Sequence, residues 1–259
     1  MSGDAGGTVA LIAPFAGWLA PLEEVPDPVF AEHMMGDGVA IDPVEGLLRA
    51  PADGEVLSIP ASAHAVTLRL RNGAELLVHI GLETVALGGK GFTPRVAPGA
   101  QVRAGEPLIA FDLDALAGSV KALITPLVVA NEGYALHREQ PGPVEAGSPI
   151  ARVERIAAAQ AGTGAAPGER HERMLTVAVP HGIHARPAAR IAAALKPFAA
   201  EVTLRRGDRV ANARSTVALL GLGAVHGEQV MATATGSDAR AAVETLAALL
   251  DRIAAEEAA

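Results

Sequence analysis

Two histidine-bearing stretches carry the residues of this chain that are best suited to chemistry. The first reads PHGIHARPAA at residues 180–189. Apolar residues recur at three- and four-residue steps over residues 188–198, which predicts a helix beginning near Arg186. Pro187 suits a first helical turn, because the N–H groups there have no partner within the helix. We therefore expect His184 to lie beside backbone N–H groups, the positive end of a helix dipole and a guanidinium, which favours phosphate.

A histidine in this position has two possible roles. Its imidazole can donate to phosphate, or attack it as a neutral nucleophile and become phosphohistidine. The alternative is a histidine that merely caps a helix. The run from Gly182 to Ala188 resembles the active-site motif of HPr, the histidine phosphocarrier of the bacterial sugar phosphotransferase system, with Ile in place of the usual Leu. This resemblance implies that His184 is phosphorylated on Nδ1, that Arg186 stabilises the phosphoryl group, and that Ala185 lies beside it.

The second stretch is a predicted hairpin with a histidine near each end. Asn72-Gly73 is a strong two-residue turn signal, because both residues tolerate positive φ. In that register Val66 lies opposite His79, and His64 is the diagonal neighbour of His79 on the same face. Such a pair suits phosphoryl transfer, in which one ring attacks and the other donates to phosphate oxygens. The alternatives are two stacked histidines, or a zinc site that lacks a third ligand nearby in sequence.

Four motifs around this hairpin are similar to the glucose-family EIIA domain of the same system. They read PDPVFAE at 26–32, GDGVAI at 36–41, AHA at 63–65 and LVHIGLETV at 77–85. The resemblance extends from Gly7 to about Arg155. It implies that His79 is phosphorylated on Nε2 and that His64 assists. Glu83 stands where the family often has Asp, which keeps the charge.

Composition excludes several classes of function. Half of the residues are apolar and only 3% are aromatic, so the core must be aliphatic. The absence of cysteine excludes a disulfide, a thiol nucleophile and a thiolate metal site within these residues. No basic leader and no membrane-length apolar run are present, so we expect a cytoplasmic protein without membrane insertion. Residues 1–155 carry a net charge of −9 and residues 156–259 of +1, which argues against nucleic acid as a partner.

The chain is predicted to contain two domains. Gly and Pro divide residues 1–155 into short pieces, which predicts an all-β antiparallel sandwich. The pattern Ala-Pro-x-x-Gly-x-aliphatic occurs at 13–19 and at 50–56, and it indicates a strand corner used twice. Residues 156–173, rich in Ala, Gly and Pro, are interpreted as a linker. Residues 174–259 are predicted to form elements in the order βαββαβα, as in the α+β open-faced sandwich of HPr domains.

Ser215 precedes the short helix expected from Thr216. It matches an HPr serine that a regulatory kinase phosphorylates in some bacteria, but a plain helix N-cap is the favoured interpretation. The remaining histidines are interpreted as surface or packing residues: His33, His137, His171, His181 and His226.

Together these resemblances imply a fused EIIA–HPr phosphotransferase that works through phosphohistidine. Phosphate would pass from phosphoenolpyruvate through enzyme I, expected to be another protein, to His184 and then to His79. It would leave to a cysteine on the separate EIIB domain of a membrane sugar permease, for glucose or N-acetylglucosamine. No metal or organic cofactor is expected. The alternative is a regulatory module whose phosphorylation state controls its binding partners, with little sugar flux.

Overall fold

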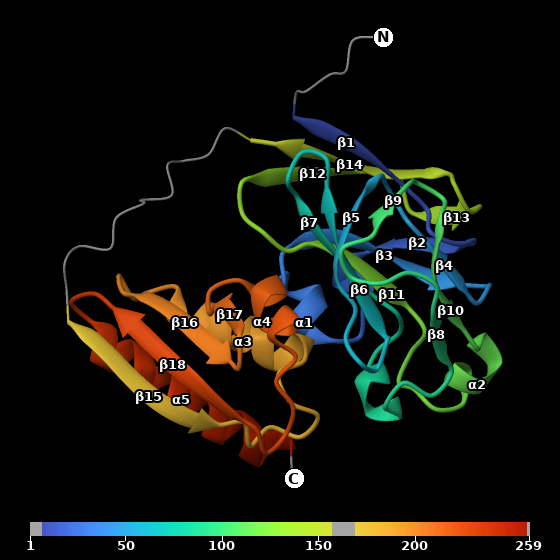
Figure 1. Cartoon of the computed structure of the whole chain (residues 1–259). Coiled ribbons are helices and arrows are strands. Elements are labelled where there is room, and N and C mark those ends of the chain that lie inside the picture. The colour runs from blue at the N-terminus through green and yellow to red at the C-terminus, as the bar shows by residue number, and fades with distance from the viewer. Residues whose placement is uncertain (1–6, 157–168, 258–259) are drawn as a thin grey trace. The chain divides into compact units, whose positions relative to one another are not determined.

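The computed structural model describes residues 7–156 and 169–257. The chain divides between residues 157 and 158 into two compact units, which we call unit 1 and unit 2. Figure 1 labels their helices and strands.

Unit 1 consists mainly of short antiparallel strands. In chain order they are β1 (Thr8–Ile12), β2 (Gly17–Pro21), β3 (Asp37–Pro43), β4 (Leu47–Arg49), β5 (Gly54–Ser58), β6 (Ala65–Leu70), β7 (Glu75–His79), β8 (Phe92–Pro94), β9 (Gln101–Val102), β10 (Pro107–Phe111), β11 (Thr125–Val129), β12 (Tyr134–Arg138), β13 (Gly142–Val144) and β14 (Pro149–Arg155). Short helical pieces interrupt them: η1 (Leu22–Glu24), α1 (Pro28–Ala31), η2 (Thr84–Leu87) and α2 (Leu113–Ala117).

These strands form a sandwich around one apolar core. The largest sheet has eight strands in the order β13-β2-β3-β11-β7-β6-β5-β9, and two three-stranded sheets, β1-β14-β12 and β4-β10-β8, complete the described part. Alternate residues of the large sheet, such as Leu68 and Val78, point into the core. There they meet Ile109 and Ile150 from the two smaller sheets. The predicted all-β antiparallel sandwich is confirmed.

The repeated Ala-Pro pattern marks two strand corners that contact each other. The Ile12 N–H donates to the Pro51 carbonyl oxygen at 2.8 Å, and the Arg49 N–H donates to the Pro14 carbonyl oxygen at 3.0 Å. A strand begins at the glycine of each repeat, β2 at residue 17 and β5 at residue 54. The corners therefore join the small sheets to the large one.

Unit 2 has the predicted element order. Its elements are β15 (Arg170–Thr176), α3 (Ala185–Leu195), β16 (Glu201–Arg206), β17 (Arg209–Asn212), α4 (Thr216–Leu222), β18 (Gln229–Thr235) and α5 (Ala239–Glu257). The sheet order is β15-β18-β16-β17. Helix α5 packs against β15, β18 and β16, while α3 packs against α4 and α5 (Figure 1). One sheet face is thus covered by helices, as in an open-faced sandwich.

The predicted linker extends too far toward the C-terminus. Residues 157–168 lie outside the described residues, but Arg170 to Arg173 belong to β15, where Arg170 lies opposite Thr235 and Arg173 opposite Ala232. The first strand of unit 2 therefore begins at Arg170, before the predicted start of this domain at residue 174. The prediction failed because this edge strand has one open face and carries charged residues there, so it lacks the apolar run of a central strand.

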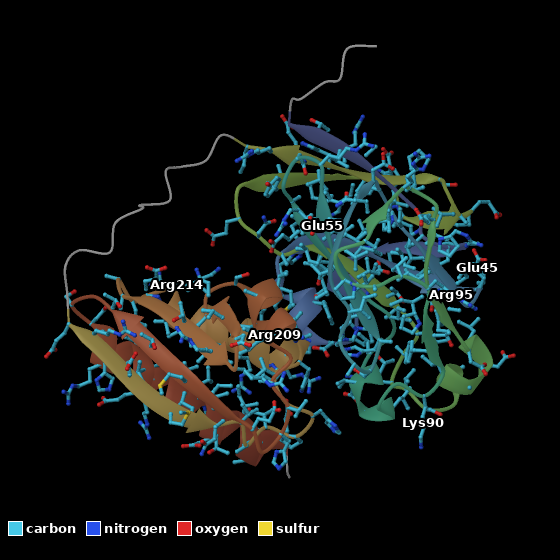
Figure 2. All side chains as sticks on the ribbon, viewed as in Figure 1. Glu45, Glu55, Lys90, Arg95, Arg209 and Arg214 are labelled. Carbon is cyan, nitrogen blue, oxygen red and sulfur yellow. The ribbon has the colours of Figure 1, made fainter. Side chains whose placement is uncertain are left out.

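Two arginines of unit 2 bind backbone carbonyl groups at the ends of elements. Arg209 donates to the Gly221 carbonyl oxygen in the last turn of α4 at 3.4 Å, and Arg214 donates to the Ala200 carbonyl oxygen at 2.9 Å. Both side chains are labelled in Figure 2. These bonds give a hydrogen-bond donor to carbonyl oxygens that lie at a helix end and in a turn, where no helical N–H reaches them.

Candidate functional site

Strands β6 and β7 form the hairpin that carries the first candidate histidines, but its register differs from the prediction. The residue opposite His79 is Ala65, one position earlier than predicted. The ladder closes at Leu70, whose N–H donates to the Ala74 carbonyl oxygen at 2.8 Å. The loop therefore has three residues and ends in Gly73 at φ +87°, the arrangement of a type I turn followed by a left-handed glycine.

Asn72 explains why the loop is longer than expected. Its side-chain amide donates to the carbonyl oxygens of Gly7 at 3.1 Å and Val153 at 3.0 Å. Its Oδ1 accepts from the Ala74 N–H at 3.2 Å. These bonds tie the turn to another sheet. The turn preference of Asn72-Gly73 cannot predict these bonds, because their partners are distant in the sequence.

His64 and His79 nevertheless contact each other. Their ring centroids are 4.9 Å apart, with the ring planes at 70°. In the observed register, regular alternation would turn His64 toward the core beside Val66. His64 instead precedes β6, directly after Ala63 at φ +49°, so the alternation of the strand does not apply to it. The expected contact is present, but a bent strand end produces it rather than a ladder diagonal.

The hydrogen bonds of His79 fix its tautomer. Its Nδ1 lies 2.8 Å from the carbonyl oxygen of Gly81. Because a carbonyl oxygen only accepts, Nδ1 carries the proton and the lone pair of the neutral ring resides on Nε2. The turn itself is held by the Gly81 N–H, which donates to Thr125 Oγ1 at 3.3 Å, and by Thr84 Oγ1, which donates to the Ile80 carbonyl oxygen at 2.8 Å. This bond leaves Nε2 as the ring nitrogen of His79 that carries the lone pair.

His64 has a hydroxyl partner. Its Nδ1 lies 2.7 Å from Ser62 Oγ. A serine hydroxyl can donate or accept. When it donates, His64 carries its proton on Nε2 and can donate a hydrogen bond to an anion held at His79.

The segment between β2 and β3 adds an apolar wall to this site. The carboxylate of Asp27 caps α1 by accepting from the Val29 N–H at 3.0 Å. One turn later the ring of Phe30 meets the ring of His79, with centroids 5.6 Å apart. The segment thus positions an aromatic side chain against the imidazole.

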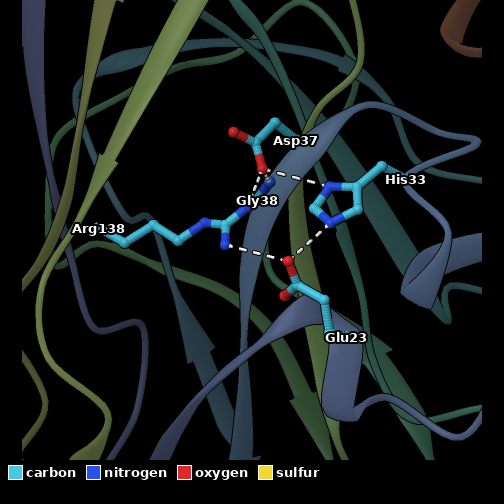
Figure 3. A network of polar contacts seen from close by, with 5 residues as sticks. All are labelled: Glu23, His33, Asp37, Gly38 and Arg138. Carbon is cyan, nitrogen blue, oxygen red and sulfur yellow. Dashed lines mark hydrogen bonds and ion pairs between the residues drawn. The ribbon is translucent and has the colours of Figure 1, made fainter.

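A polar network closes the same segment (Figure 3). His33 lies with Nε2 at 3.0 Å from Glu23 and Nδ1 at 3.3 Å from Asp37, and Arg138 contacts both carboxylates. A backbone hydrogen bond and then His33 hold the pKa of Glu23 below its ordinary 4.5. Burial lowers the pKa of Arg138, but Asp37 and Glu23 outweigh burial and raise this pKa above its ordinary value. The network ties η1 to the start of β3, and sequence reasoning assigned His33 no such role.

His184 lies at the start of α3. It is the N-cap residue, its backbone is extended, and its side chain makes no capping hydrogen bond. Its carbonyl oxygen accepts from the Ala188 N–H at 3.0 Å, which begins the helix one residue before the predicted position. The preceding loop is held by Gly182 at φ +75° and by the Ile183 N–H, which donates to the Ala224 carbonyl oxygen at 2.9 Å. The imidazole therefore lies at a helix N-terminus without capping it through its side chain.

Glu257 in the last turn of α5 is a site residue that sequence reasoning missed. Its Oε2 lies 3.4 Å from Nε2 of His184. An ionised carboxylate only accepts, so this contact selects the tautomer with the proton on Nε2 and the lone pair on Nδ1. Burial raises the pKa of Glu257 above its ordinary 4.5, although Arg186 and His181 act in the opposite direction. The only available signal was an acidic residue at a helix C-terminus, where the dipole disfavours it.

The other predicted residues of unit 2 fall into two groups. Ala185 and Arg186 are the first two residues of α3, and the charge of Arg186 acts on Glu257, so both lie at the His184 site. Ser215 is the N-cap of α4 and its Oγ accepts from the Ala218 N–H at 3.1 Å. The N-cap interpretation of Ser215 is confirmed.

Residues 7–156 and 169–257 contain neither a cluster of metal-ligating side chains nor a membrane-spanning helix. In these ranges no three His, Asp or Glu side chains are grouped as metal ligands would be. No helix in the same ranges is long and apolar enough to cross a membrane.

Family models match both units. Residues 9–135 match the EIIA 1 component of the phosphoenolpyruvate-dependent sugar phosphotransferase system, and residues 171–252 match the phosphorylation-site model of its HPr component. The chain is 49% identical over 121 residues to the glucose-specific EIIA component of Bacillus cereus, which covers 47% of this chain and 73% of the relative. It is 50% identical over 127 residues to the glucose-specific EIIBCA component of Corynebacterium glutamicum, covering 49% of this chain and 19% of that one.

A solved structure agrees with these matches. Glucose permease IIA from Mycoplasma capricolum superposes with a TM-score of 0.54 at 36% identity, covering 56% of this chain and 95% of that one. The chain belongs to the glucose-type EIIA family of the sugar phosphotransferase system, and an HPr domain follows in the same polypeptide. Its domains are phosphotransferase components of a phosphoryl relay in sugar uptake.

Proposed function

We propose that this protein passes one phosphoryl group through two of its own histidines. His184 accepts phosphate that originates from phosphoenolpyruvate and arrives through enzyme I. His79 then takes it from His184 and gives it to a cysteine on an EIIB domain of a membrane sugar permease. Because the 259 residues contain no cysteine, the acceptor thiol comes from outside them.

One observation carries the proposal: each histidine has one ring nitrogen held as a donor, and the two nitrogens are different. Nδ1 of His79 donates to the Gly81 carbonyl oxygen, and Nε2 of His184 faces the Glu257 carboxylate. The nucleophilic nitrogens are therefore Nε2 in unit 1 and Nδ1 in unit 2. The phosphoryl group is then carried on Nε2 of His79 and on Nδ1 of His184.

The transfer step balances without a cofactor. The Nε2 lone pair of His79 attacks phosphorus, the Nε2–P bond forms, and the Nδ1–P bond of phospho-His184 breaks with its electron pair returning to Nδ1. Arg186 and the N-terminus of α3 stabilise phosphoryl charge on His184, and the second imidazole, His64, donates to the phosphoryl oxygens on His79. Each held nitrogen keeps its proton throughout, and its acceptor stabilises the positive charge that develops on the ring.

The relay is tested by incubating the full chain with enzyme I and phosphoenolpyruvate. Two phosphoryl groups per chain are expected, labile in acid and stable in base, with ³¹P resonances of one Nδ1- and one Nε2-phosphohistidine. His184→Ala should abolish both signals, whereas His79→Ala should abolish only the Nε2 signal. Labelling of His79 in the His184→Ala protein, with no other HPr present, would show that the proposed order is wrong.

A further inference from the structure

An exposed apolar patch lies on the same face of the large sheet as His79. Trp18, the only tryptophan of the chain, is 55% exposed, and Val44 is 70% exposed. Trp18 lies directly opposite Asp42 on β3 and opposite Pro143 on β13. Val44, two residues beyond Asp42, and the exposed Pro143 extend the patch over three neighbouring strands.

Strand register places this patch on the phosphoryl side of the sheet. Ala20, two residues after Trp18, lies opposite Ala40, and Ala40 lies opposite Pro126. Continuing the pairing of β11 with β7 brings Pro126 opposite His79. Residues directly opposite each other share a face, and so do residues two apart on one strand. Trp18 and His79 therefore point to the same side.

The distance between Trp18 and His79 fits the size of a protein interface. β2 and β7 are three strand spacings apart, and the two rows are offset by two residues, which gives about 16 Å between the Cα atoms of Trp18 and His79. A standard interface covers about 800 Å² on each partner, a disc of about 16 Å radius. A footprint of this size that includes His79 can therefore also cover Trp18.

A hollow adjoins the patch. Its volume is about 430 Å³, and its lining includes Pro26, Asp42 and Lys121. Asp42, the residue opposite Trp18, forms part of its wall and supplies a negative charge, while Lys121 supplies a positive one. The face thus offers a projecting indole beside a depression, a shape that receives a protein surface with a complementary side chain.

We propose that this surface, formed by Trp18, Val44 and the adjoining hollow, docks the cysteine-bearing EIIB acceptor. The inference rests on the proposed function, because it takes His79 as the donor to that acceptor. The phosphoryl donor, His184, belongs to the same chain, so a high effective concentration replaces docking affinity. The acceptor thiol comes from outside these residues, so an apolar contact at Trp18 would strengthen the binding of the protein that carries it. Tryptophan is one of the residue types that are enriched among such anchors.

The test uses glucose phosphorylation by membrane vesicles. They contain the glucose-specific EIIBCA component of Corynebacterium glutamicum in which the phosphorylated histidine of its own EIIA part is replaced by alanine, so that the present chain supplies EIIA. With enzyme I and phosphoenolpyruvate, Trp18→Ala should raise the KM for the chain about tenfold with little change in kcat. Trp18→Phe should stay within about twofold, because it keeps an aromatic surface. Ile156→Ala, at an apolar residue 49% exposed outside this sheet, is the matched control and should behave as wild type.

A second readout follows docking directly. 5-Fluorotryptophan labelling of this chain gives a single ¹⁹F resonance, which should shift when the vesicles are added and stay in place with vesicles that lack EIIBCA. An unchanged KM for Trp18→Ala would overturn the docking proposal. The proposal would also be overturned if Trp18→Ala slowed transfer from His184 to His79 within the chain as much as it slowed transfer to EIIBCA. The HPr domain would then be the partner that binds this surface. Absence of glucose phosphate with the wild-type chain would instead refute the acceptor step of the proposed function.

Discussion

Gly182, two residues before His184, offers a sharp test of how the loop positions that histidine. It has φ +75°, and a Cβ built there would lie 2.2 Å from the Ala224 carbonyl oxygen and 2.6 Å from Val225 Cα. Ordinary Cβ contacts begin at 3.4 Å. A Gly182→Ala protein must therefore displace the loop, and the hydrogen bond between the Ile183 N–H and the Ala224 carbonyl oxygen weakens with it.

The expected cost separates into two parts. A side chain at positive φ costs about 1 kcal/mol. Overpacking against a backbone that cannot retreat adds about 1–3 kcal/mol. Gly227 is a matched control, because its φ is +83° but nothing lies within 4 Å of an added Cβ. We expect Gly227→Ala to lower the unfolding free energy of unit 2 by about 1 kcal/mol and Gly182→Ala by about 2–4 kcal/mol.

The assay can follow unit 2 alone. Its helices α3, α4 and α5 span 11, 7 and 19 residues, whereas α1 and α2 of unit 1 span 4 and 5. Circular dichroism of helix during denaturant unfolding therefore reports unit 2, and fluorescence of Trp18 reports unit 1. In the Gly182→Ala protein, a displacement of His184 by about 1 Å should also slow its phosphorylation by enzyme I about 100-fold. Equal stability and equal phosphorylation rates in the two variants would refute the steric argument.

Three further substitutions test contacts at or beside the sites. Glu257→Leu should slow phosphorylation of His184 about tenfold, because the ring loses the acceptor that selects its tautomer. Burial raises the pKa of Glu257 in the native state. The native state therefore binds this proton more tightly than the unfolded state, and the unfolding free energy falls as pH rises through the native pKa. The Glu257→Leu protein should lack this fall, and at neutral pH it should unfold at a higher denaturant concentration than wild type. Ser62→Ala should leave phosphate acceptance intact but slow onward transfer, measured by single-turnover quench, because His64 loses the partner of its Nδ1. Arg138→Gln should lower the unfolding free energy of unit 1 by at most about 1 kcal/mol, since its carboxylate partners are about half exposed; a larger loss in Trp18 fluorescence unfolding would contradict the view of this network as a surface tie.

Local sequence patterns determined the elements of unit 2 and one of its turns. The 3.6-residue and two-residue periods of apolar side chains give the order βαββαβα, because each element there buries one face on a shared core. The turn at Gly207-Asp208 joins β16 and β17 with Arg206 opposite Arg209, as a two-residue hairpin signal predicts. The motif around His184 likewise placed the histidine at a helix N-terminus, because Pro187 and the apolar period define that end locally.

Tertiary contacts decided what local patterns could not. The turn at Asn72-Gly73 gained a third residue because Asn72 bonds to carbonyl groups of a different sheet, which shifts the whole ladder by one position. The two imidazoles of unit 1 still meet, through a bend at Ala63 that no alternation rule contains.

The electrostatic partner of His184 was equally hidden. Glu257 lies 73 residues from His184 in the chain and reaches it only because α5 packs along the sheet beside α3. Sequence thus determined which residues could accept phosphate, since residue type and local geometry define a nucleophile at a helix end or strand end. Only the tertiary structure decided which ring nitrogen of each histidine carries the lone pair, because a tautomer is set by hydrogen-bond partners that folding brings from elsewhere.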